Sequence, residues 1–201
     1  MSYVDHAVYA LLWLSFGWAH SVLAGERAKR QLHWVFGAAY RMGYNIFAVV
    51  HIAVILVGGR YLLADASRFA LPSTAEQTLT VLQWGGAAVL GVALLQYDLG
   101  RFSGLTQLRS RLGARAVAED EPLHVTGLHR LVRHPLYTGA FLFLWGAVRT
   151  EFDFATALWG CLYLVIGTYF EERKLLTRYG EDYAQYKKRV PAYVPWKGRA
   201  A

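Results

Sequence analysis

The chain has 201 residues, of which 55% are hydrophobic and 17% are charged, with a formal net charge of +7 and one cysteine. A single cysteine excludes an internal disulfide. Apolar stretches of roughly 17–22 residues recur along the chain, and about 20 residues let a helix cross a bilayer. The expected spans are residues 7–24, 43–63, 78–97, 136–149 and 154–170.

A soluble protein with five buried helices is the alternative to a membrane protein. An outer helix of a soluble bundle carries a mixed charged face, and none of the five segments has one. We therefore predict an all-α fold: an integral membrane helical bundle of about five transmembrane helices and a C-terminal interfacial helix. The first segment is followed by GERAKR rather than a small-residue cleavage site, so we expect a retained span and not a signal peptide.

The basic residues gather in three connections. Residues 25–42 hold four Lys and Arg, residues 98–135 hold six, and the tail from 171 onward holds eight, which is 18 of the 21. With five spans these regions share one side, which the positive-inside rule makes cytoplasmic, with the N-terminus outside. A basic total also occurs in nucleic-acid-binding proteins, but here it sets topology and meets anionic headgroups. We predict no nucleic-acid partner.

The stretch RLVRHPLYTGAFLF, residues 130–143, places charges directly before an apolar run. Pro135 fits the first turn of a helix, where its missing N–H costs nothing, and it favours an extended turn before it. Arg133 and the free amides of the helix start suit an anionic group such as a carboxylate. The alternative is that Arg130 and Arg133 only extend to headgroups, which leaves the His134–Pro135 pair without an explanation.

Two further groups of residues follow the last apolar segment. Glu171 and Glu172 come directly after it, and ionisable groups at membrane depth are functional candidates. They could accept a hydrogen bond from a ribose hydroxyl or an amine, or they could be ordinary charged residues where a helix leaves the bilayer. Tyr179, Tyr183 and Tyr186 recur at helical intervals, which fits a helix lying on the membrane or an aromatic lid over a sulfonium or adenine.

Weaker patterns argue against two other kinds of site. His124, His129 and His134 are five apart rather than the three or four that places ligands on one helix face, so we predict no metal site. The glycine-rich stretch at 85–91 lies inside an expected span, so it predicts close helix packing rather than a nucleotide loop. Asp98 stays a candidate because it opens the long inner connection.

The blocks VTGLHRLVRHPLYTGAF and FEERKLLTRYGEDYAQYKKRVPAYVPW resemble the C-terminal half of the isoprenylcysteine carboxyl methyltransferase superfamily. The shared signature is RHP-x-Y-x-G, then a pair of glutamates, then a Y/F-G-x-x-Y-x-x-Y-x-x-x-V-P stretch, and it covers residues 125–198. HSVLA, YRMGYN and YDLGRFSGLTQL in the N-terminal half resemble the bacterial branch of NnrU-like proteins and methanethiol S-methyltransferases.

The resemblance implies an integral membrane methyltransferase that uses S-adenosylmethionine, without a Rossmann domain and in a bacterial inner membrane. Residues 99–201 would be the cofactor-binding half, and residues 1–98 a three-span region of the same membrane domain. The implied cofactor-binding residues are Arg133, His134, Pro135, Tyr137, Gly139, Glu172, Tyr183 and Tyr186. The implied catalytic residues are Glu171, Glu172 and Arg173, and the candidates for substrate contact are Asp98, Gln107 and His129.

The expected acceptor is a small or lipophilic thiol or carboxyl compound that enters from the membrane. Transfer to a thiolate or carboxylate depends on positioning and desolvation, so it needs no catalytic triad. The VIGTYF stretch before the glutamates lacks the polar residues of prenylcysteine-specific members, which favours a small thiol or another apolar molecule. Two alternatives are a nicotinamide-dependent membrane reductase of the sterol reductase type and a non-catalytic NnrU-like membrane factor.

Overall fold

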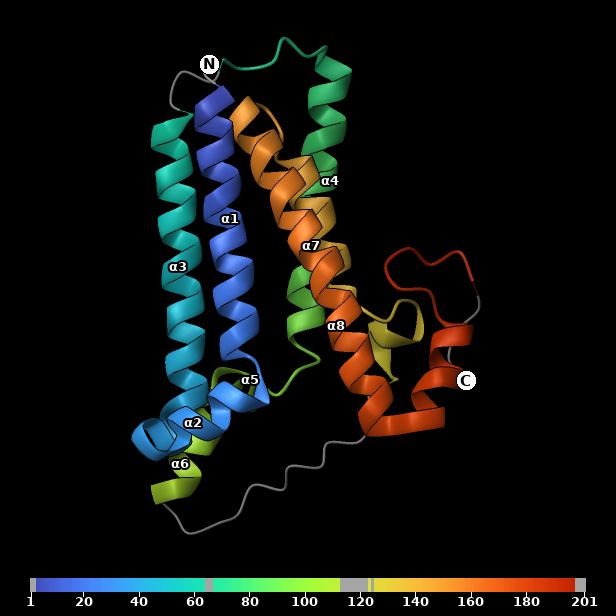
Figure 1. Cartoon of the computed structure of the whole chain (residues 1–201). Coiled ribbons are helices and arrows are strands. Elements are labelled where there is room, and N and C mark those ends of the chain that lie inside the picture. The colour runs from blue at the N-terminus through green and yellow to red at the C-terminus, as the bar shows by residue number, and fades with distance from the viewer. Residues whose placement is uncertain (1–2, 64–66, 113–122, 124, 198–201) are drawn as a thin grey trace. The chain divides into compact units, whose positions relative to one another are not determined.

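The computed structural model describes residues 3–63, 67–112, 123 and 125–197 (Figure 1). Within these residues the regular structure is helical, apart from one isolated antiparallel bridge between Arg68 and Thr150. The all-α prediction is therefore confirmed. The chain divides into two compact units, one of Met1–Ala66 with Tyr97–Asp120 and one of Ser67–Gln96 with Glu121–Ala201.

The first unit is built on two long helices that run side by side (Figure 1). Its elements are α1 (Tyr3–Leu23), α2 (Glu26–Phe36), the 3-10 turn η1 (Gly37–Ala39), α3 (Tyr40–Leu62), α5 (Leu99–Ser103) and α6 (Leu105–Leu112). The fully buried ring of Tyr9 on α1 lies against Gly59 of α3, where a Cβ would come within 2.7 Å of the ring. The Gly104 turn between α5 and α6 has φ +90° and lies against the backbone of Met42, where α3 begins. The basic connections 25–42 and 98–112 thus meet at one end of this unit.

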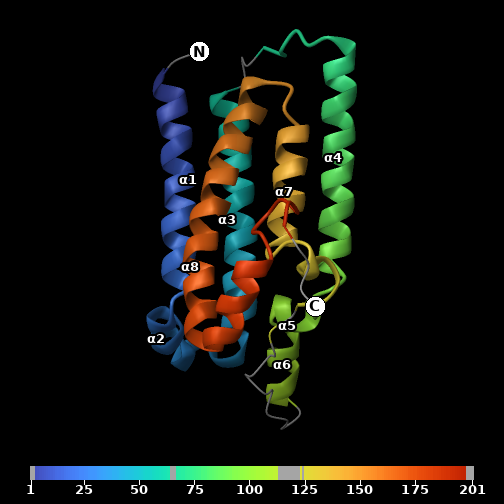
Figure 2. The same ribbon diagram turned by 90° about the vertical axis from the view of Figure 1, so that its right-hand side faces the viewer.

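The second unit consists of α4 (Ser73–Leu94), the 3-10 turn η2 (Gly127–Arg130), α7 (Pro135–Gly146) and α8 (Glu151–Arg189). Figure 2 shows α7 beside α4. Glycines bring the two backbones together: a Cβ on Gly86 would lie 2.8 Å from the carbonyl oxygen of Gly139, and one on Gly146 would lie 2.6 Å from the Cα of Gln83. The expected close packing through the 85–91 glycines thus occurs at Gly86, whereas Gly85 and Gly91 have open space around them.

The helix α8 consists of two parts. A capping box opens it, in which the Thr150 hydroxyl accepts from the Asp153 N–H and the Asp153 carboxylate accepts from the Thr150 N–H. At Gly180 the backbone leaves helical geometry with φ 55° and ψ −126°, which a residue without a Cβ adopts readily. Residues 181–189 form the separate C-terminal helix that the sequence predicts.

In the part of the chain that the structure describes, three helical segments are long and apolar enough to cross a membrane: Glu26–Leu62, Ser73–Leu94 and Glu151–Arg189. The helix α7 covers 12 residues, about 18 Å at 1.5 Å per residue, so the expected span at 136–149 is too short to cross a bilayer by itself. The count of five spans therefore stays a prediction. The division into residues 1–98 and 99–201 also stays one, and the compact units group α4 with α7 and α8.

Candidate active site

The turn before α7 is held by the C-terminal segment of the same unit. His134 is the N-cap of α7, and the buried Pro135 occupies its first position, as the sequence predicts. The Arg133 N–H donates to the Pro191 carbonyl at 2.9 Å, and the His134 N–H donates to the Ala192 carbonyl at 3.0 Å. The amides of these two turn residues are therefore occupied by the carbonyls of residues 191–192.

Glu172 is the electrostatic centre of the site. Its Oε1 accepts from the Arg133 guanidinium at 2.8 and 2.6 Å and from Nε2 of His134 at 3.0 Å, while Oε2 pairs with Nζ of Lys187 at 2.6 Å. The Glu172 side chain is only 7% exposed. Burial alone would raise its pKa, but the hydrogen bonds from His134, Lys187 and Arg133, with the Arg133 charge, lower the pKa to about 2. Glu172 is thus a carboxylate whose acceptor positions are already used.

Arg133 also fastens the end of α8. Its Nη1 donates to the Val190 carbonyl and, at 3.3 Å, to the Lys187 carbonyl. Cations are favoured at this end of a helix because its last carbonyls carry partial negative charge. With Nε and Nη2 on Glu172, the guanidinium joins α8 to its own tail. Binding of a ligand carboxylate by Arg133 stays a prediction, and in this structure the guanidinium binds Glu172 and the carbonyls of Lys187 and Val190.

Glu171, by contrast, faces outward. Its side chain is 45% exposed, and its Oε2 accepts a hydrogen bond of 2.9 Å from the Tyr137 hydroxyl. Nδ1 of His134 lies 3.7 Å from the same oxygen. The rings of His134 and Tyr137 are stacked, with centroids 5.4 Å apart and planes within 6° of parallel. The result is an oriented, accessible carboxylate beside two parallel aromatic rings.

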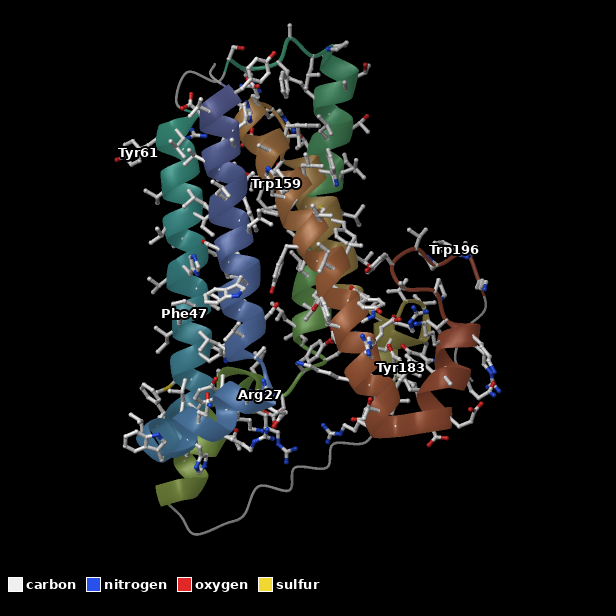
Figure 3. The ribbon with its side chains drawn as sticks, viewed as in Figure 1. Arg27, Phe47, Tyr61, Trp159, Tyr183 and Trp196 are labelled. Carbon is white, nitrogen blue, oxygen red and sulfur yellow. The ribbon has the colours of Figure 1, made fainter. Side chains whose placement is uncertain are left out.

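The tail tyrosines form a core rather than an exposed lid. Tyr183, Tyr186 and Val190 are buried against Leu175, Leu176 and Tyr179 of the preceding turns, together with Leu123 and Val125. The Tyr186 hydroxyl donates to the His129 carbonyl at 2.6 Å. The Tyr183 hydroxyl is buried without a hydrogen-bond partner among the described residues, and burial followed by the nearby Glu172 carboxylate raises its pKa. Figure 3 labels Tyr183 in this part of the chain.

The other predicted residues are not part of the cluster around Glu172. Arg173 lies over the Tyr169 ring, 5.7 Å from its centroid. Gly139 packs against the Leu90 backbone of α4, so its role here is helix contact. His129 makes a 3.1 Å contact from Nδ1 to the Arg133 carbonyl, which fixes the turn.

Asp98 and Gln107 belong to the first unit. Asp98 is the N-cap of α5 and accepts from the Arg101 N–H at 3.0 Å, which gives it a structural task. Gln107 is in α6, and its side chain lies outside the described residues, as does His124. Among the described residues no group of three or more His, Cys, Asp or Glu could hold a metal ion.

Lys187 is the residue of the cluster that the sequence did not indicate. It is 15 positions beyond Glu172, a separation that would put the two about 22 Å apart on a straight helix. The fold-back after Gly180 brings them together. Gly180 was the one signal in the sequence, because a glycine after a basic turn often ends a helix.

Comparison with known proteins places the chain among membrane methyltransferases. It is 31% identical over 190 residues to the methanethiol S-methyltransferase of Pseudomonas deceptionensis, covering 94% of this chain and 72% of the relative. It is 28% identical over 189 residues to methanethiol S-methyltransferase 1 of Bradyrhizobium diazoefficiens, covering 93% of this chain and 66% of that relative. The chain thus spans about two thirds of the length of these relatives.

A shorter match links the chain to the prenylcysteine enzymes. Over 83 residues, 38% of this chain and 34% of the relative, it is 32% identical to the protein-S-isoprenylcysteine O-methyltransferase of Schizosaccharomyces pombe. No family model and no solved structure matches. The two long matches to methanethiol S-methyltransferases and the shorter match to a prenylcysteine methyltransferase confirm the resemblance seen in the sequence. The chain belongs to the methanethiol S-methyltransferase branch of the isoprenylcysteine carboxyl methyltransferase-like membrane methyltransferases.

Proposed function

We propose that the protein transfers a methyl group from S-adenosylmethionine to a small or lipophilic acceptor, with a small thiol such as methanethiol as the first choice. The family supports this proposal, because relatives named methanethiol S-methyltransferase are similar to this chain over most of its length. The same support favours a membrane protein with the acceptor dissolved in the bilayer. We further propose a bacterial inner-membrane location with the N-terminus outside and the C-terminus in the cytoplasm.

One feature of the geometry carries the proposal: the outward-facing carboxylate of Glu171 next to the stacked rings of His134 and Tyr137. A sulfonium is a cation, and carboxylates and aromatic faces are the groups that stabilise cations in proteins. The Tyr137 hydroxyl orients the carboxylate, so little side-chain freedom is lost on binding. These residues therefore fit the cofactor, with Glu171 and Tyr137 as its main contacts.

When bound, S-adenosylmethionine would supply an electrophilic methyl group to the sulfur of an acceptor thiolate, and S-adenosylhomocysteine would be the leaving product. The protein's part is positioning and exclusion of water. Glu172 is unsuited to act as a base, because three cationic or hydrogen-bonding side chains occupy it and hold its pKa near 2. We therefore assign Glu172 to holding the site together, and Glu171 to the ligand.

The membrane provides the route for the acceptor. The apolar segment 154–170 leads directly into Glu171, so the proposed cofactor site begins where the bilayer ends. Exposed apolar side chains cover that segment, among them Leu162, Val165 and Ile166. A small apolar thiol concentrates in such surroundings and reaches the site without crossing water.

The test is binding and turnover by the full-length purified chain. Calorimetry should give S-adenosylmethionine binding to the wild type, and Glu171→Gln should abolish it while the protein stays folded by circular dichroism. Isotopically labelled S-adenosylmethionine with a panel of thiols, prenylcysteine carboxylates and lipids, read by mass spectrometry, should label a thiol. Binding of NADPH in its place would support the reductase alternative, and binding without turnover of any acceptor would support a non-catalytic factor.

A further inference from the structure

The helix α2 of the first unit carries two arginines and a tryptophan along one face. Arg27, Arg30 and Trp34 are three and four positions apart, so their side chains lie above one another on the helix. All three are exposed, and Trp34 is 85% exposed. Ala28, on the other side of the helix, is buried. The helix therefore packs on the protein with one side and presents a basic, aromatic face with the other.

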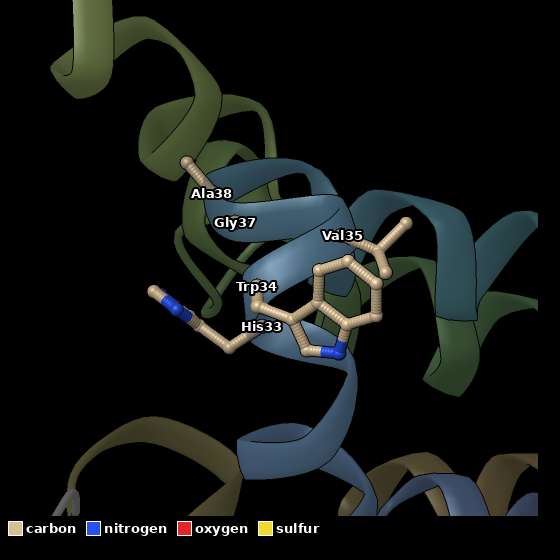
Figure 4. A pocket seen from close by; sticks show the side chains of 5 residues that line it. All are labelled: His33, Trp34, Val35, Gly37 and Ala38. Atoms are coloured by element: carbon tan, nitrogen blue, oxygen red, sulfur yellow. The ribbon is translucent and has the colours of Figure 1, made fainter.

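A hollow lies at the C-terminal end of this face. It has a volume of about 350 Å³ and is lined by His33, Trp34, Val35, Gly37 and Ala38. Figure 4 shows the Trp34 ring and the Val35 side chain projecting from the last turn of α2. Gly37, with φ 50°, ends the helix and turns the chain into η1 and α3. Apolar and aromatic surface thus adjoins the cationic side chains.

The position of α2 in the chain determines what this face meets. Two residues, Ala24 and Gly25, connect α2 to the apolar helix α1, and η1 connects it to α3. The segment Glu26–Leu62, which includes α2 and α3, is apolar enough to cross a membrane. We place α2 at the end of that segment, where α3 leaves the hydrocarbon. An indole exposed to water is unfavourable, whereas at headgroup level its ring is buried and its N–H stays solvated.

The charge of α2 selects among lipids. Arg27, Lys29 and Arg30 oppose a single acidic residue of the helix, Glu26. Guanidinium groups bind phosphate oxygens through paired N–H donors, and they do so most strongly when the lipid carries net negative charge. We propose that α2 is a binding site for anionic phospholipid headgroups, with Arg27 and Arg30 on the phosphates and Trp34 inserted between the lipids. This proposal is independent of the methyltransfer reaction.

The lipid preference is tested with the full chain in nanodiscs of phosphatidylcholine mixed with phosphatidylglycerol. Native mass spectrometry measures the ratio of the two lipids that remain bound to the released protein. Removing each basic residue from an anionic surface weakens attraction by about fivefold, so Arg27→Gln with Arg30→Gln should lower the phosphatidylglycerol preference by roughly 25-fold. The charge-conserving pair Arg27→Lys with Arg30→Lys should keep most of it.

The matched control removes the same charge elsewhere. Lys174→Gln with Lys188→Gln changes two exposed residues of the second unit and should lower the preference much less than the α2 pair does. If the control lowers the preference as much as the α2 pair, net charge alone explains it and the site does not exist. Wild-type preference in the Arg27→Gln, Arg30→Gln protein would likewise overturn the proposal.

The placement of α2 is tested with a nitroxide at residue 34. The chain has one cysteine, so Trp34→Cys in a Cys161→Ser background gives a single label, and Lys29→Cys gives its counterpart on another side of the helix. Electron paramagnetic resonance should find the label at 34 accessible to oxygen and the label at 29 accessible to a water-soluble nickel complex. A label at 34 that is immobile and shielded from both would indicate a protein partner and refute the lipid assignment.

Discussion

Glu172→Gln is the perturbation that best separates the two adjacent glutamates. The substitution keeps the size of the side chain but removes the negative charge that Arg133, His134 and Lys187 share. The Arg133 side chain is only 9% exposed, so its charge would remain buried without the Glu172 carboxylate to balance it. We therefore expect the tail, residues 181–196, to lose its attachment to the turn before α7.

The magnitude follows from two independent considerations. Removing one member of a buried ion pair costs about 3–5 kcal/mol. The lowering of the Glu172 pKa from its ordinary value of 4.5 to about 2, at ~1.4 kcal/mol per pKa unit, indicates about 3–4 kcal/mol from the same contacts. A loss of about 3 kcal/mol corresponds to a roughly 150-fold rise in the population of the detached tail.

Hydrogen exchange read by mass spectrometry measures that population. In Glu172→Gln, peptides that cover residues 181–196 and the turn at 133–134 should exchange roughly two orders of magnitude faster, while α4 peptides keep wild-type protection. Glu171→Gln is the matched control, because Glu171 is exposed and touches Tyr137 rather than the tail. Wild-type exchange in Glu172→Gln, or equal acceleration in both variants, would refute the assignment of Glu172 as the attachment point.

The same structure makes three further predictions. Gly86→Ala should lower thermal stability by about 1–3 kcal/mol because its Cβ would meet the α7 backbone, whereas Gly85→Ala, with open space around it, should not; unfolding in detergent compares them. Tyr137→Phe should weaken S-adenosylmethionine binding by roughly 10- to 150-fold, since a hydrogen bond to a charged group contributes about 1.5–3 kcal/mol, without changing tail exchange. Because the pKa of Glu172 is lowered in the fold, its stabilisation should be complete above about pH 4.5 and vanish as pH falls through about 2. The protection of the tail amides, corrected for the intrinsic exchange rate at each pH, should lose this dependence in Glu172→Gln.

Much of the fold follows from local patterns in the sequence. Apolar length predicted the long helices, Pro135 marked the start of α7, and Gly180 marked the break before the C-terminal helix. These signals are local, because they depend on backbone geometry within one turn. The extent of α7 was not predictable in this way: its apolar run continues to residue 148, but the helix ends at Gly146, where the chain approaches α4.

Part of the cluster around Glu172 was predictable from the sequence, but the contacts of its residues were not. The sequence brought Arg133, His134, Tyr137, Glu171 and Glu172 forward as one group, and the structure brings these five together. It did not indicate that the tail carbonyls of residues 190–192 would occupy the turn, because that contact joins segments more than 50 residues apart. The partner of an arginine depends on the tertiary structure, and a sequence motif does not show which charged group will pair with that arginine.

The adjacent glutamates show why a motif alone could not assign the roles. Successive residues of an α-helix point about 100° apart, so Glu171 and Glu172 have different surroundings although both lie near His134. One turns to the tail, where three partners hold it charged and buried, and the other turns to Tyr137 and solvent. The two orientations are linked through His134. Glu172, which holds the tail, also holds the His134 ring, and that ring stacks on Tyr137, which orients Glu171. Loss of Glu172 should therefore weaken cofactor binding indirectly, and supplying the C-terminal segment as a separate peptide should not restore it, because the missing group belongs to α8.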